Sequence, residues 1–296
     1  MTDLSLLFLV FVWGLNYSIV KEALNHFSPL TFNGIRFLIA SLVIFILFKG
    51  YNRTFPSFRK DWGKVIVVGL LGNTFYQILF ILGVSWTLAG NTSLILATTP
   101  VFVALFAVML EKEKVSPRMW GGIFASLFGV GLVVIGSHSA IGLGKGTLRG
   151  DLTVFLAGIV WSIYIVASAP LVRKYGAMAT TAATLWTGAF FLFLCSIPSL
   201  LHQNWSIITG RDWGALFYSA ILSIALAQVL WYRAIGERGN ARTSAYSNLI
   251  PLVGLLVAWP MLGETPQFLQ IIGGAAIIAG LFLTGFHGGI EELTSL

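Results

Sequence analysis

The stretches NTSLILATTPVFVALFAVMLEKE (residues 91–113) and NARTSAYSNLIPLVGLLVAWPMLGE (residues 240–264) are two copies of one apolar segment. They align at an offset of 151 positions, which pairs Pro100 with Pro251 and Glu113 with Glu264. The same offset, and one of 148 nearer the N-terminus, pairs further identical residues: Val12-Trp13 with Val160-Trp161, Trp62-Gly63 with Trp213-Gly214, Gln77 with Gln228, Thr92-Ser93 with Thr243-Ser244, Gly122 with Gly273, and Gly129 with Gly280. This ordered set predicts a duplicated unit, with residues 1–148 as the first copy and 149–296 as the second.

The composition predicts a chain whose solvent is mostly lipid. Of its 296 residues, 57% are hydrophobic and only 10% are charged, whereas a soluble domain carries about 25% charged residues. Apolar stretches long enough to cross a bilayer alternate with short polar breaks. We expect an all-α integral membrane protein with ten transmembrane helices, near residues 4–20, 30–48, 64–82, 91–110, 117–136, 152–169, 178–200, 213–233, 243–262 and 266–286.

The distribution of lysine and arginine predicts the orientation. With the N-terminus in the cytoplasm, twelve of these residues fall in inner loops and four in outer loops, as the positive-inside rule requires. Both termini are therefore expected to be cytoplasmic. Because each copy holds five helices, an odd number, the second copy should enter the membrane from the opposite side, as in inverted-topology repeats.

Several other classes of protein are disfavoured. The net charge of +7 follows from the loop bias, so no nucleic-acid partner is expected. The segment GLGKGT (residues 142–147) has Gly146 where a phosphate-binding loop requires Ser or Thr after Lys145. There is no HExxH or GxSxG motif, and the single cysteine, Cys195, cannot form an internal disulfide. We expect no enzymatic activity, no cofactor and no metal site.

The sequence resembles a known transporter family. WGLNYSIVKEALNHFSPLTFNGIRF (residues 13–37) is similar to the first-repeat signature of the EamA family of the drug/metabolite transporter superfamily, and the two stretches quoted above are similar to its fourth and ninth helices. The resemblance covers essentially the whole chain. It implies ten helices in two inverted repeats and export or exchange of small metabolites, with amino-acid exporters of the YddG type as the best-characterised kind. One departure is that the fourth helix ends Leu-Glu-Lys-Glu rather than Leu-Gly-Glu.

Polar and aromatic side chains at membrane depth are the candidate substrate contacts. Amides and phenols in hydrocarbon need partners, and they serve either as a cavity lining or as hydrogen bonds between helices. The candidates are Trp13, Asn16, Tyr17, Arg36, Tyr76, Gln77, Thr98, Trp161, Tyr164, Trp186, Gln228, Tyr246 and Asn248. A lining of neutral donors and aromatic rings suits an amphipathic solute without net charge, such as an aromatic or aliphatic amino acid.

Arg36 lies inside the otherwise apolar stretch of residues 31–41, where a guanidinium costs several kcal/mol if it faces lipid. It either attracts a substrate carboxylate or acts as a structural lock. As a lock it would bind carbonyls at a neighbouring helix end or pair with Glu264.

Four further residues are assigned gating or structural roles: Glu113, Glu264, Pro100 and Pro251. The two glutamates are expected to accept hydrogen bonds from amides at the start of the next helix, or to pair with a basic neighbour. Small residues on the fifth and tenth helices, including Gly129 and Gly273, favour close helix packing or a dimer contact.

Transport without a proton relay is expected, because every acidic residue lies at a helix end, in a loop or in a tail. The sequence therefore predicts a multi-pass secondary transporter of the cytoplasmic (inner) membrane, a monomer or weak homodimer in contact with lipid. It would export or exchange small metabolites, foremost amino acids, by alternating access. A flippase for a lipid-linked substrate, an exporter of another metabolite or drug class, and a channel stay open as alternatives.

Overall fold

The computed structural model describes residues 2–50, 56–110, 117–141, 147–238, 246 and 249–283, and every element in these ranges is helical. In chain order these are α1 (Thr2–Ala23), α2 (Pro29–Gly50), α3 (Trp62–Leu70), η1 (Leu71–Phe75), α4 (Tyr76–Trp86), α5 (Ala89–Leu96), α6 (Thr99–Leu110), α7 (Pro117–Ile141), α8 (Leu148–Tyr175), α9 (Ala177–Leu201), η2 (Trp205–Ile207), α10 (Gly210–Phe217), η3 (Tyr218–Leu226), α11 (Ala227–Arg238), α13 (Ile250–Leu262) and α14 (Phe268–Leu283).

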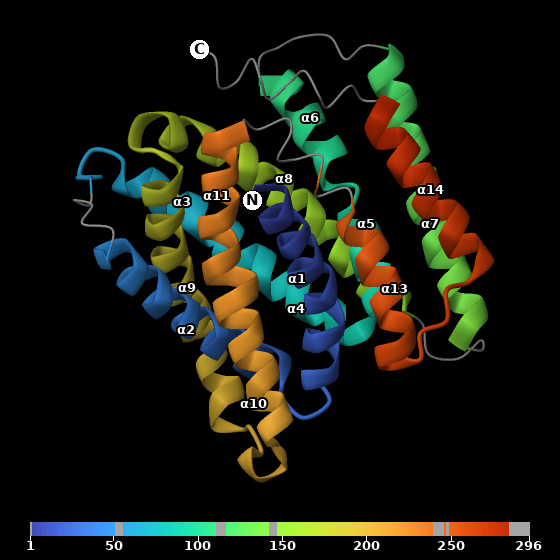
Figure 1. The fold of residues 1–296 in the computed structure, drawn as a ribbon, viewed down its shortest axis with the longest axis horizontal. Coiled ribbons are helices and arrows are strands. Elements are labelled where there is room, and N and C mark those ends of the chain that lie inside the picture. The colour runs from blue at the N-terminus through green and yellow to red at the C-terminus, as the bar shows by residue number, and fades with distance from the viewer. Residues whose placement is uncertain are drawn as a thin grey trace.

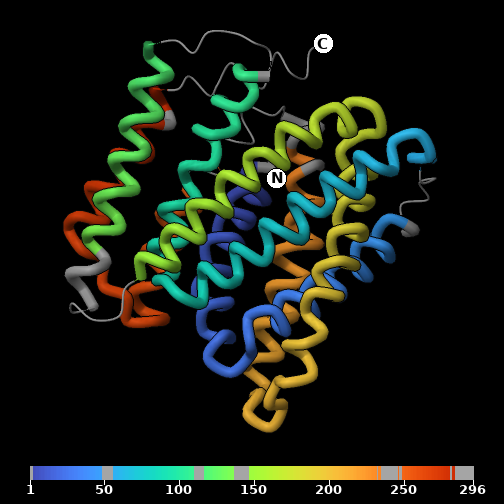
Figure 2. The backbone as a smooth tube through the Cα atoms, turned by 180° about the vertical axis from the view of Figure 1, so that it is seen from behind, coloured from blue at the N-terminus to red at the C-terminus, as the bar shows by residue number. Residues whose placement is uncertain are grey.

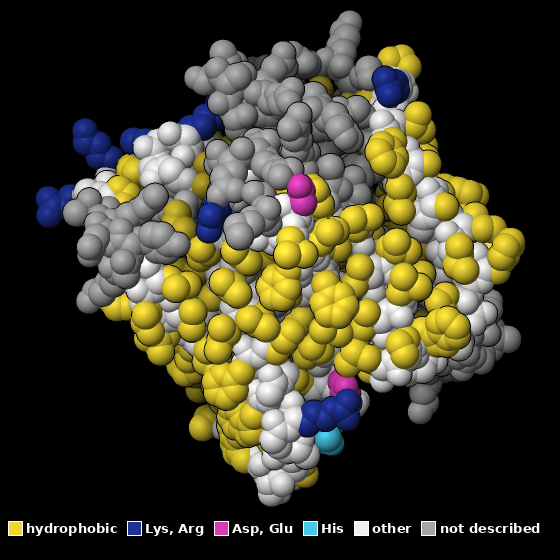
Figure 3. Space-filling view, in the orientation of Figure 1, with side chains coloured by type: hydrophobic (Ala, Val, Ile, Leu, Met, Phe, Trp, Pro, Cys, Tyr) yellow, Lys and Arg dark blue, Asp and Glu magenta, His cyan; other side chains and the backbone are white. Residues whose placement is uncertain are grey.

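These helices account for ten membrane crossings. Eight continuous segments are long and apolar enough to span a bilayer, and the shorter apolar helices Ile250–Leu262 and Phe268–Gly280 supply the other two. Large hydrophobic side chains such as Leu42, Phe128 and Phe190 are exposed on the outside of the bundle. Figure 3 shows a broad apolar surface on one face of the bundle, with charged groups toward its edges. The prediction of an all-helical membrane protein with ten helices is confirmed.

The two halves of the chain interlock. Successive crossings run in alternating directions, so that α1 and α8, the first helices of the two halves, run oppositely (Figure 1). We call the end of the bundle where α1 begins the N-terminal side, and the other end the opposite side. The first helix of each half packs against the third and fourth helices of the other: α1 contacts α11 and α13, and α8 contacts α4, α5 and α6.

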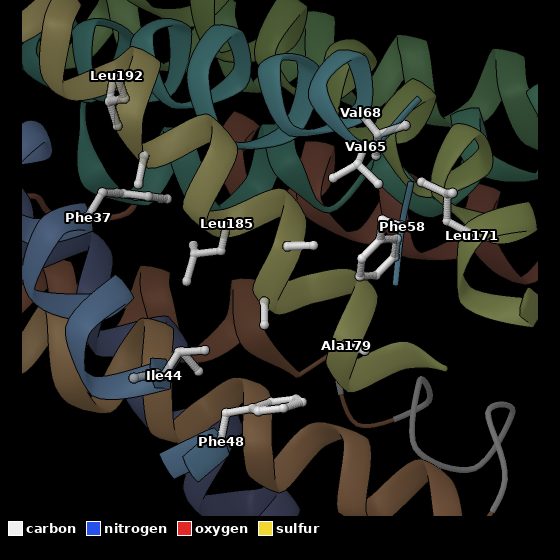
Figure 4. Packing of buried hydrophobic residues seen from close by; sticks show 14 residues of the cluster. Phe37, Ile44, Phe48, Phe58, Val65, Val68, Leu171, Ala179, Leu185 and Leu192 are labelled. Atoms are coloured by element: carbon white, nitrogen blue, oxygen red, sulfur yellow. The ribbon is translucent and has the colours of Figure 1, made fainter. Parts of the chain in front are cut away.

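A buried cluster of aliphatic and aromatic side chains joins α2, α3, α8 and α9. Figure 4 shows Phe37, Phe48, Val68, Leu171 and Leu185, which line the space between these helices. The buried members of this cluster, which come from both halves, are at most 7% exposed. Close packing of this kind fixes the helices that carry the site described below.

The third helix of each half contains a π-helical segment. η1 occupies residues 71–75, and the last five residues of η3, 222–226, lie 151 positions later. The sequence had predicted plain helices at both places. A π segment inserts one extra residue into a turn and often marks a functional site. Here each π segment directly precedes the turn that carries Gln77 or Gln228.

The fourth crossing is also irregular, although it was predicted as one continuous helix. It breaks between Leu96 and Thr99, where the amides of Ala97 and Thr98 donate to carbonyls only three residues back. Pro100 explains the break, because it has no amide hydrogen and its ring disfavours a regular helix through the preceding turn.

Helices α7 and α14 form a close pair at one edge of the bundle, visible in Figures 1 and 2. A Cβ added at Gly129 would lie 2.5 Å from the carbonyl oxygen of Gly273, and one added at Gly273 would lie 2.6 Å from that of Gly129. The two backbones therefore touch, which only glycine permits. The small faces serve packing within one chain.

We expect Gly129→Ala to lower the thermal stability of the purified protein, because overpacking a tight contact costs about 1–3 kcal/mol. Gly131→Ala is the matched control: it lies on the same helix, and nothing is within 4 Å of an added Cβ. Melting of the two variants in detergent, followed by tryptophan fluorescence, measures the difference. Equal melting temperatures would contradict the direct backbone contact.

Candidate functional site

Arg36 lies inside the bundle and is only 2% exposed. Its Nη1 donates to Ser219 Oγ at 3.0 Å, and its Nη2 donates to Gln77 Oε1 at 2.9 Å. Ser219 Oγ in turn donates to Asn16 Oδ1 at 2.7 Å. Because these residues come from α2, η3, α4 and α1, one guanidinium links helices of both halves. Burial of a charge is tolerated here through these hydrogen bonds.

Aromatic rings surround the same guanidinium. Its Cζ lies 5.9, 5.4 and 5.9 Å from the ring centroids of Phe32, Phe37 and Phe80, within the range of cation–π attraction. The proposed pairing of Arg36 with Glu264 was wrong. Glu264 binds elsewhere, and the acceptors of Arg36 are neutral side chains.

A row of aromatic rings extends from the arginine across the centre of the bundle. Phe80 lies 5.8 Å from Tyr76 and 6.3 Å from Tyr17 between ring centroids. Tyr76 lies 4.6 Å from Trp161, and Trp161 stacks on Tyr164 at 4.7 Å. All but Phe80 are half-buried. The row brings together rings from α1, α4 and α8 at the centre of the bundle.

Glycine lets the π segment η1 approach this row. A Cβ added at Gly72 would lie within 2.6 Å of three ring atoms of Tyr164. The π segment therefore places a bare backbone against the end of the row.

Other predicted site residues form hydrogen bonds or ring contacts within the protein. The indole nitrogen of Trp13 donates to the Ser223 carbonyl at 2.9 Å, and its ring lies 5.3 Å from that of Trp231. Thr98 Oγ1 donates to the Ile95 carbonyl at the break in the fourth crossing. Gln228 is half-buried at the start of α11.

Two predicted residues lie away from the central row. Trp186 sits between α9 and α2, where its indole nitrogen donates to the Ser41 carbonyl at 3.2 Å. The hydroxyl of Tyr246 donates to Asp3 at 2.6 Å, at the N-terminal side of the bundle. Asn248 and Glu113 fall outside the described residues.

Glu264 caps a helix of the other half. Its two carboxylate oxygens accept from the amides of Ala89 and Gly90 at 3.0 and 2.9 Å, at the start of α5. Partial burial raises the pKa of the Glu264 carboxyl above its usual range, although the two amides and the nearby Lys21 favour the charged form. The expectation of amides at a helix start holds, but the helix is the fourth and not the next one along the chain.

Lys21 binds the other end of the same turn, which connects α4 to α5. Its Nζ donates to the carbonyls of Val84 and Ser85 at 2.8 and 3.0 Å, at the end of α4. Pro251, the second residue of α13, lies nearby in the bundle, with its carbonyl 3.4 Å from Ser93 Oγ on α5. These contacts favour a structural role for Glu264 and Pro251.

The structure contains a buried polar network around Asp151 that the sequence analysis does not predict. Asp151, 1% exposed in the first turn of α8, accepts from Thr87 Oγ1 and from Asn91 Nδ2. The amide oxygen of Asn91 accepts from Gln270 Nε2 at 2.6 Å. Asp151 had been treated as a helix-end residue. Its position in the first turn of a helix was the available signal, but its burial depends on packing between the two halves.

The part of the chain that the structure describes contains no group of three or more His, Cys, Asp or Glu side chains that could hold a metal ion. Among the described residues, the centre combines the Arg36 guanidinium, neutral amide and hydroxyl groups, and a row of aromatic rings.

Comparison with known proteins agrees with this geometry. The model of the EamA-like transporter family matches residues 1–135 and again 148–286. An "Uncharacterized transporter" of Archaeoglobus fulgidus is 31% identical over 96% of both chains. A "Probable amino-acid metabolite efflux pump" of Salmonella typhimurium is 27% identical over 95% of this chain and 93% of its own. A "Probable terminal-alkyne amino-acid exporter" of Streptantibioticus cattleyicolor is 26% identical over 94% and 91%.

A solved crystal structure shares the fold. It superposes with a TM-score of 0.65 at 21% identity and covers 94% of this chain and 96% of its own. At this identity the likeness concerns the path of the backbone.

We expect Arg36→Met to lower thermal stability, because Gln77 and Ser219 lose a buried donor at a cost of about 1–3 kcal/mol. Arg36→Lys should fall between this variant and wild type, since one ammonium cannot reproduce the fork that serves both acceptors. Melting of the three proteins in one detergent measures the order. A stable Arg36→Met protein that no longer distinguishes carboxylate-bearing solutes would instead assign Arg36 to the substrate.

Proposed function

The chain belongs to the EamA-like transporter family, and from this premise we propose that it exports or exchanges neutral and aromatic amino acids across the cytoplasmic membrane. The observation that carries the proposal is the aromatic row from Tyr17 to Tyr164, which begins beside the buried guanidinium of Arg36. Rings suit an apolar side chain, and a cation with neutral amides suits the carboxylate end of the same solute.

The charge pattern of the centre favours a solute without net charge. Arg36 is surrounded by neutral partners, and the acidic side chains that the structure describes lie at helix ends or in loops. A multiply charged solute would find one cation, already bonded to Gln77 and Ser219. We propose exchange or facilitated diffusion, because the central row carries no carboxylate that could relay protons.

We further propose that the two halves are inverted-topology repeats with both termini in the cytoplasm. The opposite directions of α1 and α8 support the inversion (Figure 1). The bias of basic residues toward the loops on the N-terminal side supports the orientation. Such repeats favour two states of similar energy, one open to each side.

The names of two relatives support the class of substrate. Proteins named as an amino-acid metabolite efflux pump and a terminal-alkyne amino-acid exporter align with more than nine-tenths of this chain. Both names concern amino acids or their metabolites.

Counterflow in proteoliposomes tests the proposal. Vesicles that contain the purified protein and unlabelled phenylalanine should take up labelled phenylalanine, saturably and with competition from other neutral amino acids. Uptake by vesicles without protein is the control. Well-folded protein that exchanges no amino acid would contradict the substrate, and uptake that never saturates would indicate a channel.

We expect Trp161→Ala to raise the KM for aromatic substrates by roughly two- to tenfold, because one stacked aromatic contact contributes about 0.5–1.5 kcal/mol beyond the area it buries. Trp120→Ala is the control, since Trp120 is 45% exposed on α7 and stacks only on Phe124 among the ring contacts described. Initial rates of counterflow over a range of substrate concentrations measure KM. Equal values for the two variants would remove Trp161 from the site.

A further inference from the structure

The four aspartates of the chain form two pairs related by the internal repeat. Asp3 and Asp151 are 148 positions apart, the offset that relates the first helices of the two halves. Asp61 and Asp212 are 151 positions apart, the offset that relates the third helices. Each pair therefore occupies one place in the repeated unit, once on each side of the bundle.

On the N-terminal side, both aspartates bind residues of the second half. Asp61, before α3, accepts from Lys174 Nζ at 2.6 Å and from the Tyr175 hydroxyl at 2.7 Å, at the end of α8. These bonds hold the pKa of the Asp61 carboxyl well below its usual range. Asp3, in the first turn of α1, accepts from the Tyr246 hydroxyl at 2.6 Å.

On the opposite side, the equivalent aspartates bind residues of the first half. Asp212, in the first turn of α10, lies 3.0 Å from the ring nitrogen of His26, which follows α1. Asp151, in the first turn of α8, accepts from Thr87 and Asn91 at the start of the fourth crossing.

The partners follow the same symmetry. His26 and Lys174 are themselves 148 positions apart, so that the pair Asp212–His26 repeats the pair Asp61–Lys174 with the halves exchanged. Tyr246 and Asn91 are not equivalent residues, but each belongs to the stretch that forms the fourth crossing of its half. The same type of contact between the halves is therefore present at both ends of the bundle.

We propose that the four aspartates form two latches, one that closes the N-terminal side and one that closes the opposite side. The N-terminal latch comprises Asp3 with Tyr246 and Asp61 with Lys174. The opposite latch comprises Asp151 with Thr87 and Asn91, and Asp212 with His26. Both latches are closed in this structure, and transport opens one while the other holds.

The two latches should stabilise their closed states by similar free energies. Each joins the first and third helices of one half to the other half through carboxylates at or near helix N-termini, where the helix dipole favours negative charge. Removing one latch therefore shifts the population toward the state open on its side, and removing both restores the balance. The proposal rests on the alternating-access part of the proposed function and is independent of the substrate.

Hydrogen–deuterium exchange of the full chain in lipid nanodiscs, without any substrate, tests the latches. The variants Asp3→Ala and Asp151→Ala make the same change at equivalent positions. Asp3→Ala should raise exchange in the first turns of α1 and α3 roughly tenfold and lower it in the first turns of α5 and α8, as expected for the loss of one charge-assisted hydrogen bond. Asp151→Ala should do the reverse. In the double variant, the ratio of exchange rates between the two sides should return to the wild-type value.

Glu22→Ala is the control. Glu22 also bridges the two halves on the opposite side, through Arg211 at 3.1 Å, but Arg211 is 79% exposed and the pair has no counterpart at the other end. Glu22→Ala should leave the ratio of exchange rates between the two sides unchanged. If an alanine variant fails to fold, the asparagine variants Asp3→Asn and Asp151→Asn should show the same opposite signs at smaller size.

Faster exchange near each mutation, with no slowing on the far side, would overturn the proposal, because simple loosening is local. Opposite shifts in a protein that exchanges no amino acid would support the latches and refute only the substrate assignment.

Discussion

The guanidinium of Arg36 is the constraint around which the centre of the protein is arranged. Hydrocarbon cannot solvate it, so the protein supplies Gln77 from α4 and Ser219 from η3. Ser219 reaches Asn16 on α1, and Phe80 lies between the guanidinium and the aromatic row. Fixing one cation thus sets the relative positions of four elements. The same bonds orient the ring faces that we assign to the substrate.

Much of this arrangement could be predicted from the sequence. The apolar spans gave the ten helices, and the offset of 151 positions pointed to the duplication, because both depend on patterns along the chain. The aromatic and amide residues of α1, α4 and α8 could be named because polar groups at membrane depth are rare. Their assembly into a row around Tyr76 and Trp161 required the structure.

Other features could not be predicted, for physical reasons. The π segments η1 and η3 arise from a shift in backbone hydrogen bonding that leaves no mark on hydrophobic periodicity. Trp186 looked equivalent to Trp161 by type and depth, yet it faces α2. The acceptors of Arg36 come from 41 and 183 positions away, and Glu264 binds amides 174 and 175 positions away. Such choices between distant partners follow from how helices pack.

The interlocking of the halves supplies hydrogen-bond partners to several polar groups of the apolar bundle. Each half carries irregular backbone, at the break before Pro100 and at the π segments, where carbonyls or amides lose regular helical partners. Side chains of the other half also bind these elements: Glu264 accepts from amides at the start of α5, and Arg36 donates to the hydroxyl of Ser219 within η3. Each half of the chain therefore receives some of its hydrogen-bond partners from the other half.

This completion has a consequence for biosynthesis. A ribosome delivers the first five helices to the membrane before Ser219, Glu264 and Lys174 exist. Until then Arg36 lacks one acceptor, the amides of Ala89 and Gly90 lack their carboxylate, and Asp61 lacks its principal cation. The newly inserted first half therefore lacks part of its native contacts, and it reaches its final conformation only when the last helices are inserted.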